Sequence, residues 1–189
     1  MNKMVVVTGA TTGTGYCVAQ KFAANGYDVC ITSRDQARAQ EAAARLKAEN
    51  DGKIETFGYG LEVLDELQMA AMFDDLKQKG HLLSTLVLVA ANMGINMPNF
   101  LEVDFKDWIR VIDTNIGWNF MFCRQAAKHM LQLGGGAIVV IGSVNGIRTT
   151  KNRSAYCTSK SGLHGLARNL AVELGPCHIR VNTVVAGGI

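Results

Sequence analysis

Short apolar runs alternate with longer segments of helical character along the whole chain, and this alternation restricts the fold more than any other feature. The runs have the length of strands and are predicted at 4–8, 28–32, 54–59, 83–90, 137–141 and 179–185. Helices are predicted from a glycine-rich turn to Asn25-Gly26, at 35–50, at 64–79, as one or two helices within 105–131, and at 154–174. Strands that alternate with helices connect by right-handed crossovers into a parallel sheet that is covered on both faces. The sequence therefore predicts an α/β fold with three αβα layers.

The composition is that of a globular domain. The 189 residues carry a formal net charge of +3, and 48% of them are hydrophobic. A chain of this length forms one domain, predicted to span 1–189. The small positive excess is spread along the chain, which argues against nucleic-acid binding. The longest strongly apolar run, 86–91, is much too short to cross a membrane.

Cysteine and histidine show no ligand pattern. The five cysteines are an odd number without a C-x-x-C pair. They are therefore predicted to be buried free thiols in a reducing compartment, and the protein to be cytoplasmic. The four histidines lack H-E-x-x-H or any other metal-ligand spacing, so no metal site is predicted.

A glycine-rich turn follows the first predicted strand, and it reads Thr8-Gly9-Ala10-Thr11-Thr12-Gly13-Thr14-Gly15. Glycines let the backbone approach a pyrophosphate closely, and the start of the next helix offers unpaired N–H groups and the positive end of its dipole. This context favours dinucleotide binding by Gly9, Thr11, Thr12, Gly13 and Gly15, and the alternative is a strand–helix turn without a ligand. No G-K-[ST] element is present, which disfavours a nucleoside triphosphatase.

The end of the second predicted strand bears on the cofactor. A carboxylate at this place binds the ribose hydroxyls of NAD, whereas an arginine accommodates the 2′-phosphate of NADP. Ser33 and Arg34 occupy the tip, so NADP(H) is favoured and NAD(H) is the alternative. The competing interpretation of Arg34 is a solvated surface charge. Asp35 stands one position later and is expected to cap the next helix.

Three residues of the second half form a candidate catalytic group. Tyr156 and Lys160 are four apart on a predicted helix, so both side chains leave from one face. Ser143 follows the fifth predicted strand, at the sheet edge where open α/β sheets bind ligands. A neighbouring ammonium favours the phenolate of a tyrosine, so Lys160 could make Tyr156 a usable acid and base. Ser143 could hold a substrate oxygen with its hydroxyl.

Together these motifs resemble the short-chain dehydrogenases/reductases, over essentially the whole chain. The turn matches the family's T-G-x-x-x-G-x-G, Tyr156 and Lys160 match its Y-x-x-x-K, and Ser143 matches its serine. Asn115 matches the helix asparagine that completes the family's tetrad. The resemblance implies that Tyr156 donates or accepts the proton and Ser143 orients the substrate. It also implies that Lys160 binds the nicotinamide ribose, and that Asn115 holds a water that relays protons through Lys160.

Further cofactor contacts are implied by the same resemblance. Glu62 stands where the family usually has an aspartate near the adenine. Asn92 and Gly94 belong to the segment A-N-M-G, which replaces the family's N-N-A-G. Gly187 and Ile189 lie where the family's backbone approaches the nicotinamide carboxamide.

The resemblance also sets expectations for architecture. It implies a Rossmann-like, doubly wound parallel sheet of seven strands, of which six are present, with the C-terminal segment that covers the substrate absent from this sequence. Gly142 replaces a common serine and Ala186 a common proline. A homodimer or homotetramer is implied, because helices within 115–131 and 154–174 align with those that pair between subunits in the family.

The expected function is NADP(H)-dependent hydride transfer between a nicotinamide and a small-molecule carbonyl or secondary alcohol. The substrates of the family include 3-oxoacyl thioesters, sugars and hydroxysteroids, and the sequence does not choose among them. The alternative is a non-catalytic NADP-binding homologue that acts as a partner subunit. Arg148, Lys151 and Arg153 form a basic patch just before Tyr156. The patch is either a solvated loop or attracts an anionic substrate or an acidic carrier protein.

Overall fold

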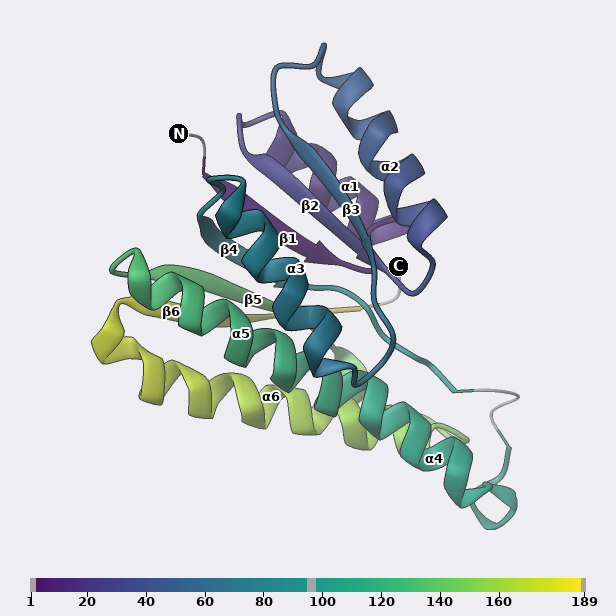
Figure 1. The fold of residues 1–189 in the computed structure, drawn as a ribbon. Helices are drawn as coiled ribbons and strands as arrows, with labels where there is room; N and C mark the ends of the chain where they lie inside the picture. The colour runs from purple at the N-terminus through teal and green to yellow at the C-terminus, as the bar shows by residue number, and fades with distance from the viewer. Residues whose placement is uncertain (1–2, 95–97, 188–189) are drawn as a thin grey trace.

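One parallel sheet organises the chain. The computed structural model describes residues 3–94 and 98–187. Its strands are β1 (Met4–Thr8), β2 (Asp28–Ser33), β3 (Thr56–Gly60), β4 (Leu83–Leu88), β5 (Gly136–Ser143) and β6 (Ile179–Ala186). They lie in the order β3-β2-β1-β4-β5-β6, and every neighbouring pair is parallel (Figure 1). The chain thus starts at the centre, winds to one edge, returns and winds to the other, which confirms the predicted doubly wound α/β fold.

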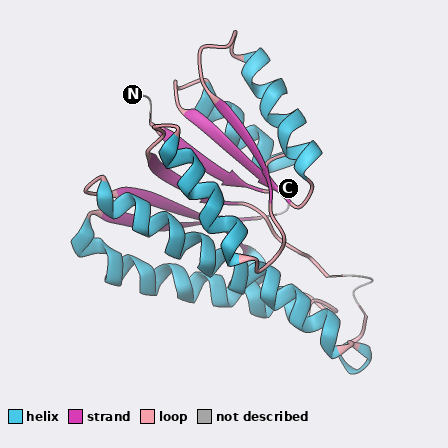
Figure 2. Cartoon of the chain, viewed as in Figure 1, coloured by secondary structure: helices cyan, strands magenta, loops and turns pink. Residues whose placement is uncertain are grey.

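Helices cover both faces of this sheet (Figure 2). They are α1 (Gly13–Ala23), α2 (Gln36–Glu49), α3 (Glu66–Gln78), α4 (Phe105–Ile112), α5 (Trp118–Gln132) and α6 (Ser154–Leu174). Helices α1 and α2 pack on one face, and α3, α5 and α6 on the other. Helix α4 extends beyond the sheet and packs along α6 (Figure 1). No helix of the described residues is both long and apolar enough to span a bilayer.

Strand β1 shows why the sheet needs both helical layers. Met4 and Val6 belong to the hydrophobic cluster beneath α3, α5 and α6, whereas Val5 and Val7 belong to the cluster beneath α1 and α2. All four side chains are fully buried. Successive side chains of a strand point to opposite faces, so an uninterrupted apolar run requires a cover on each side.

Besides small shifts of strand ends, the structure departs from the sequence predictions in a helix and in the cysteines. The predicted helical region 105–131 is divided by a π-helical turn at Asp113–Gly117, between α4 and α5. The cysteines are free, but the prediction that all are buried is wrong: Cys17 is exposed and Cys177 is half-buried. Cys17 lies on α1, which presents Tyr16, Ala19 and Ala23 to the core, and the residue after Tyr16 faces outward.

Candidate active site

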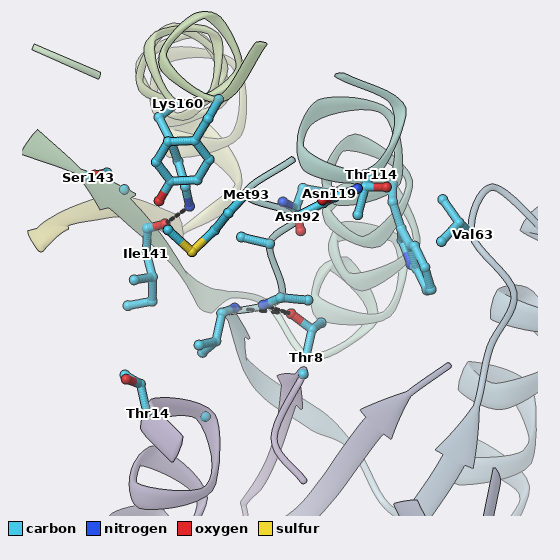
Figure 3. Close-up of a pocket in the computed structure, with 18 of the residues that line it drawn as sticks. Thr8, Thr14, Val63, Asn92, Met93, Thr114, Asn119, Ile141, Ser143 and Lys160 are labelled. Atoms are coloured by element: carbon cyan, nitrogen blue, oxygen red, sulfur yellow. Dashed lines mark hydrogen bonds between the residues drawn. The ribbon is translucent and has the colours of Figure 1, made fainter. Parts of the chain in front are cut away.

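A cleft of about 1630 Å³ follows the carboxyl edge of the sheet, where the strand order reverses between β1 and β4 (Figure 3). Open parallel sheets bind ligands at this switch point. The cleft is lined by the glycine-rich turn, the ends of β2, β4 and β5, and parts of α4 and α6. It therefore brings together residues that are more than 140 positions apart in the chain, such as Gly9 and Tyr156.

The glycine-rich turn is folded tightly against the loop after β4. Gly9 has φ +63°, and a Cβ at this position would lie 2.9 Å from the Cα of Ala90. A Cβ at Gly15 would overlap the carbonyl oxygen of Gly9. The hydroxyl of Thr8 accepts hydrogen bonds from the backbone N–H groups of Val89 and Ala90, at 3.0 and 3.1 Å. These contacts fix the floor of the cleft and leave no room for a side chain at Gly9 or Gly15.

The start of α1 suits an anion. Thr12 is its N-cap residue, yet its side chain makes no capping hydrogen bond, and the first turn carries no acidic residue. The first N–H groups of a helix have no partner within the helix. Thr11, Thr12, Thr14 and Gly15 line the cleft here, while Gly13, with φ +55°, shapes the turn and is not among the lining residues. This donor set and the glycine floor fit the pyrophosphate of a dinucleotide.

Two arginines stand at the end of β2. Ser33 and Arg34, the residues predicted to bind the cofactor, line the cleft, and Arg38 of α2 joins them. Asp35 caps α2 by accepting a hydrogen bond from the Arg38 N–H at 3.0 Å, which confirms its expected role. Arg38 was not predicted. Its place in the first turn of the helix that follows Arg34 is a signal that could have found it.

Ser143, Tyr156 and Lys160 line the same cleft. Ser143 ends β5, and its oxygen accepts a hydrogen bond of 3.1 Å from the N–H of Asn145. That bond leaves the Ser143 proton free to be donated. Lys160 lies with its Nζ 5.7 Å from the centre of the Tyr156 ring. The predicted group is therefore assembled from a strand end and one face of α6.

Lys160 is an unusual lysine, because only 2% of it is exposed. Its Nζ donates a hydrogen bond of 2.8 Å to the carbonyl of Ile141, seen as a dashed line in Figure 3. Burial penalises the ammonium form and lowers the pKa of Lys160 from 10.5 to about 8. The ammonium is thus held in place by the fold at an energetic cost.

Asn115 lies in the π-helical turn and is fully buried. Its Oδ1 accepts a hydrogen bond from the N–H of Asn92 at 2.7 Å, and its Nδ2 donates to the carbonyl of Asn92 at 2.8 Å and to Ser159 Oγ at 2.9 Å. Its own carbonyl accepts from Asn119 Nδ2 at 2.8 Å. The Asn115 side chain therefore joins the loop after β4 to α6, and it is not among the residues that line the cleft.

Sequence reasoning missed the partners of this network. Ser159 and Asn119 complete it, and Asn145 holds Ser143 through a backbone group. Asn119 is spaced four residues from Asn115, which is a usable signal. No sequence pattern marks Asn145, because its contact uses the main chain.

Only some of the other predicted cofactor residues line the cleft. Asn92 lines the cleft, and its side chain accepts a hydrogen bond from the N–H of Gly94. Gly94 has φ +90° and is not among the residues that line the cleft. Glu62 is exposed and absent from the lining, although the next residue, Val63, lines it. Gly187 lines the cleft, and Ile189 lies outside the described residues.

Gly142 has a structural explanation. A Cβ at this position would overlap Nε2 of His164, a buried α6 side chain. His164 fills the space beside β5 that a serine would need. Burial lowers the pKa of His164, and the nearby Arg168 and Lys160 lower it further.

Within residues 3–94 and 98–187, no three His, Cys, Asp or Glu side chains are grouped as metal ligands. The polar side chains of the lining are instead mostly hydroxyls, amides and cations.

The chain was compared with known proteins. The family model described as short chain dehydrogenase matches residues 3–189. The 3-oxoacyl-[acyl-carrier-protein] reductase of Mus musculus is 34% identical over 190 residues, which are 100% of this chain and 76% of that protein. A structure of ElxO with NADPH bound is 31% identical and superposes with a TM-score of 0.89, over 99% of this chain and 74% of that one.

A structure of NAD⁺-bound xylitol dehydrogenase superposes with a TM-score of 0.91. It covers 98% of this chain and 70% of that one at 24% identity, and it supports the fold alone.

Proposed function

This chain belongs to the short-chain dehydrogenase/reductase family of oxidoreductases, and from that premise we propose that it is an NADP(H)-dependent enzyme that interconverts a carbonyl and a secondary alcohol. The observation that carries the proposal is the single cleft that Ser143, Tyr156 and Lys160 share with the glycine-rich turn. An acid–base group and a dinucleotide cradle in one cleft are what hydride transfer to a carbonyl requires.

Ser143 and Tyr156 act on the substrate oxygen. The Ser143 oxygen already accepts from Asn145, so its proton is directed to the substrate and fixes the carbonyl in place. Tyr156 then donates its proton to the oxygen in reduction and removes it in oxidation. A positioned general acid of this kind contributes roughly 10²- to 10⁴-fold to the rate.

Lys160 stabilises the charge that Tyr156 develops. Its ammonium lies 5.7 Å from the ring centre, and burial strengthens its field because little water screens it. Asn115 is a positioning residue. Its side chain makes its hydrogen bonds to Asn92 and Ser159. It therefore contributes by fixing the distance between the loop after β4 and α6.

The residues present fit a nicotinamide dinucleotide. The start of α1 and the glycine turn would hold the pyrophosphate, and Ser33, Arg34 and Arg38 would hold a 2′-phosphate on the adenosine ribose. Two cations and a hydroxyl at the end of β2 suit that phosphate, whereas no carboxylate among the described residues lines this place to bind the free ribose hydroxyls of NAD. The cofactor, when bound, supplies or accepts the hydride. NADP(H) is therefore preferred over NAD(H).

We extend the proposal to the number of domains, the cellular compartment and the oligomeric state. The described residues share one sheet, which supports a single domain, and free thiols suit a reducing cytoplasm. Exposed apolar side chains on α5 and α6 support a homodimer or homotetramer: Phe120, Leu131 and Val172 are 41, 50 and 77% exposed. Light scattering on the eluting peak of a sizing column measures the mass and tests the assembly.

The decisive experiment is the substitution Tyr156→Phe. NADPH-linked reduction of a ketone panel should fall by about 10²-fold or more, while NADPH binding, followed by its fluorescence, should stay within a few-fold. Turnover that equals the wild type would refute the role of Tyr156. A wild-type chain that binds NADPH but turns over no carbonyl would instead favour the binding-subunit alternative.

A further inference from the structure

The cleft carries cations that the proposed reaction does not use. Besides Lys160 and the two arginines at the end of β2, its lining includes Lys106, Arg110 and Arg153, against a single carboxylate, Asp113. Lys106 and Arg110 come from α4, and Arg153 immediately precedes α6. Because α4 packs along α6, these cations border the substrate end of the cleft.

Arg153 stands closest to the proposed chemistry. Its guanidinium carbon lies 6.0 Å from the centre of the Tyr156 ring. Asn152, with φ +60°, reverses the chain directly before it, and Arg153 is the N-cap residue of α6. The backbone therefore places this side chain beside the acid–base tyrosine rather than leaving it on a free loop.

Two of these three cations, Lys106 and Arg153, have no carboxylate partner among the described residues. Arg110 is paired with Asp107 at 2.7 Å. Arg153 is also partly buried. A partly desolvated guanidinium is costly unless an anion faces it, and it binds a carboxylate or phosphate in a bidentate manner. The exposed Arg148 and Lys151 add to the positive potential at the same mouth.

We propose that the substrate carries a carboxylate or phosphate group a few bonds from its reacting carbonyl, and that Arg153 is the residue that selects it. The inference rests on the proposed function, and it chooses between the two interpretations of the basic patch. The anion binds Arg153 while the carbonyl oxygen lies between Ser143 and Tyr156. Lys106 faces the same space from α4 and supports the charge.

The test uses substrate pairs that differ in charge and share a carbonyl. Acetoacetate is compared with ethyl acetoacetate, and dihydroxyacetone phosphate with dihydroxyacetone, using the full chain and NADPH. The wild type should prefer the anion in at least one pair, by about tenfold in kcat/KM, the size expected for one charge-assisted hydrogen bond. The pair that shows the preference tells a carboxylate from a phosphate.

Two variants and salt identify the source of the preference. Arg153→Ala should reduce the ratio of anionic to neutral kcat/KM by about tenfold, and Arg153→Lys should retain part of it. Lys128→Ala removes a charge from an exposed position on α5 outside the cleft, and it should leave the ratio unchanged. Added NaCl should lower the ratio more in the wild type than in Arg153→Ala, where only the weaker field of the other cations remains.

The outcomes separate the two levels of the proposal. If kcat/KM for the neutral ketones equals or exceeds that for their anionic partners, the anion preference is overturned. The proposed function is unaffected by that result. A preference that persists in Arg153→Ala would overturn the assignment to Arg153. Failure to reduce either member of any pair, with NADPH bound, would contradict the proposed function and the anion preference together.

Discussion

Replacing Lys160 with methionine should make the folded protein more stable at neutral pH while it removes activity. The lysine is almost completely buried, and its pKa falls from 10.5 to about 8 because burial penalises the ammonium. Between these values the folded state binds fewer protons than the unfolded state, so the stability of the wild type rises with pH. The penalty is fully present below about pH 8 and is relieved as the pH approaches 10.5.

The magnitude follows from the interval between the two pKa values. It corresponds to roughly 3 kcal/mol below pH 8, most of which is relieved between pH 7 and pH 10. Methionine also loses the hydrogen bond to the Ile141 carbonyl, which costs roughly 1–3 kcal/mol at every pH. The net gain at pH 7 is therefore small, and the pH dependence of the difference is the clear signal.

Urea denaturation of the cofactor-free protein measures this difference. The free energy of unfolding of Lys160→Met minus that of the wild type should fall by roughly 2–3 kcal/mol from pH 7 to pH 10. Lys128→Met, at an exposed lysine of α5, is the control and should give a flat difference. A flat difference for Lys160→Met as well would refute the idea that the fold holds a penalised ammonium at this place.

Three further predictions concern packing, cofactor choice and capping. Gly142→Ala should lower the free energy of unfolding in urea by about 1–3 kcal/mol, because its methyl group overlaps the His164 ring. Adding His164→Ala should recover part of this stability, and no recovery would contradict the packing explanation. Arg34→Ala should raise the KM for NADPH by about tenfold, the value of one charge-assisted contact, and leave the KM for NADH nearly unchanged; equal effects on both cofactors would argue against phosphate recognition. Asp65→Ala removes the side chain that caps α3 and should lower stability by about 1 kcal/mol, measurable as a fall in Tm; an unchanged Tm would mean that the cap is not needed.

The fold could be predicted because several local signals agree. Element boundaries are indicated by the apolar runs, by the glycines after β1 and by the capping residue Asp35. Helix α6 has the predicted bounds, Ser154–Leu174. Strand ends differ from the predictions by up to two residues, since the apolar run of 83–90 continues past the last ladder pair of β4 at Leu88. Hydrophobicity marks burial, whereas a strand ends where its pairing ends.

The site could be predicted only in part. Tyr156, Lys160 and Ser143 were found because motif spacing places them on one edge. The π-helical turn around Asn115 was missed because the apolar residues of 105–131 fit one helix or two equally well. Arg153 was noticed only as a charge, since its distance from the Tyr156 ring depends on the backbone reversal at Asn152.

The π-helical turn at Asp113–Gly117 changes the rotation of α4 about the helix axis relative to α5. Without it, α4 and α5 would form one continuous helix. A π-turn holds one residue more than an α-turn, and one residue rotates everything beyond it by about 100° about the helix axis. Deleting a single residue here would keep α4 and α5 helical yet turn the α4 residues that border the cleft away from it. The length of this turn therefore decides whether Lys106 and Arg110 line the cleft.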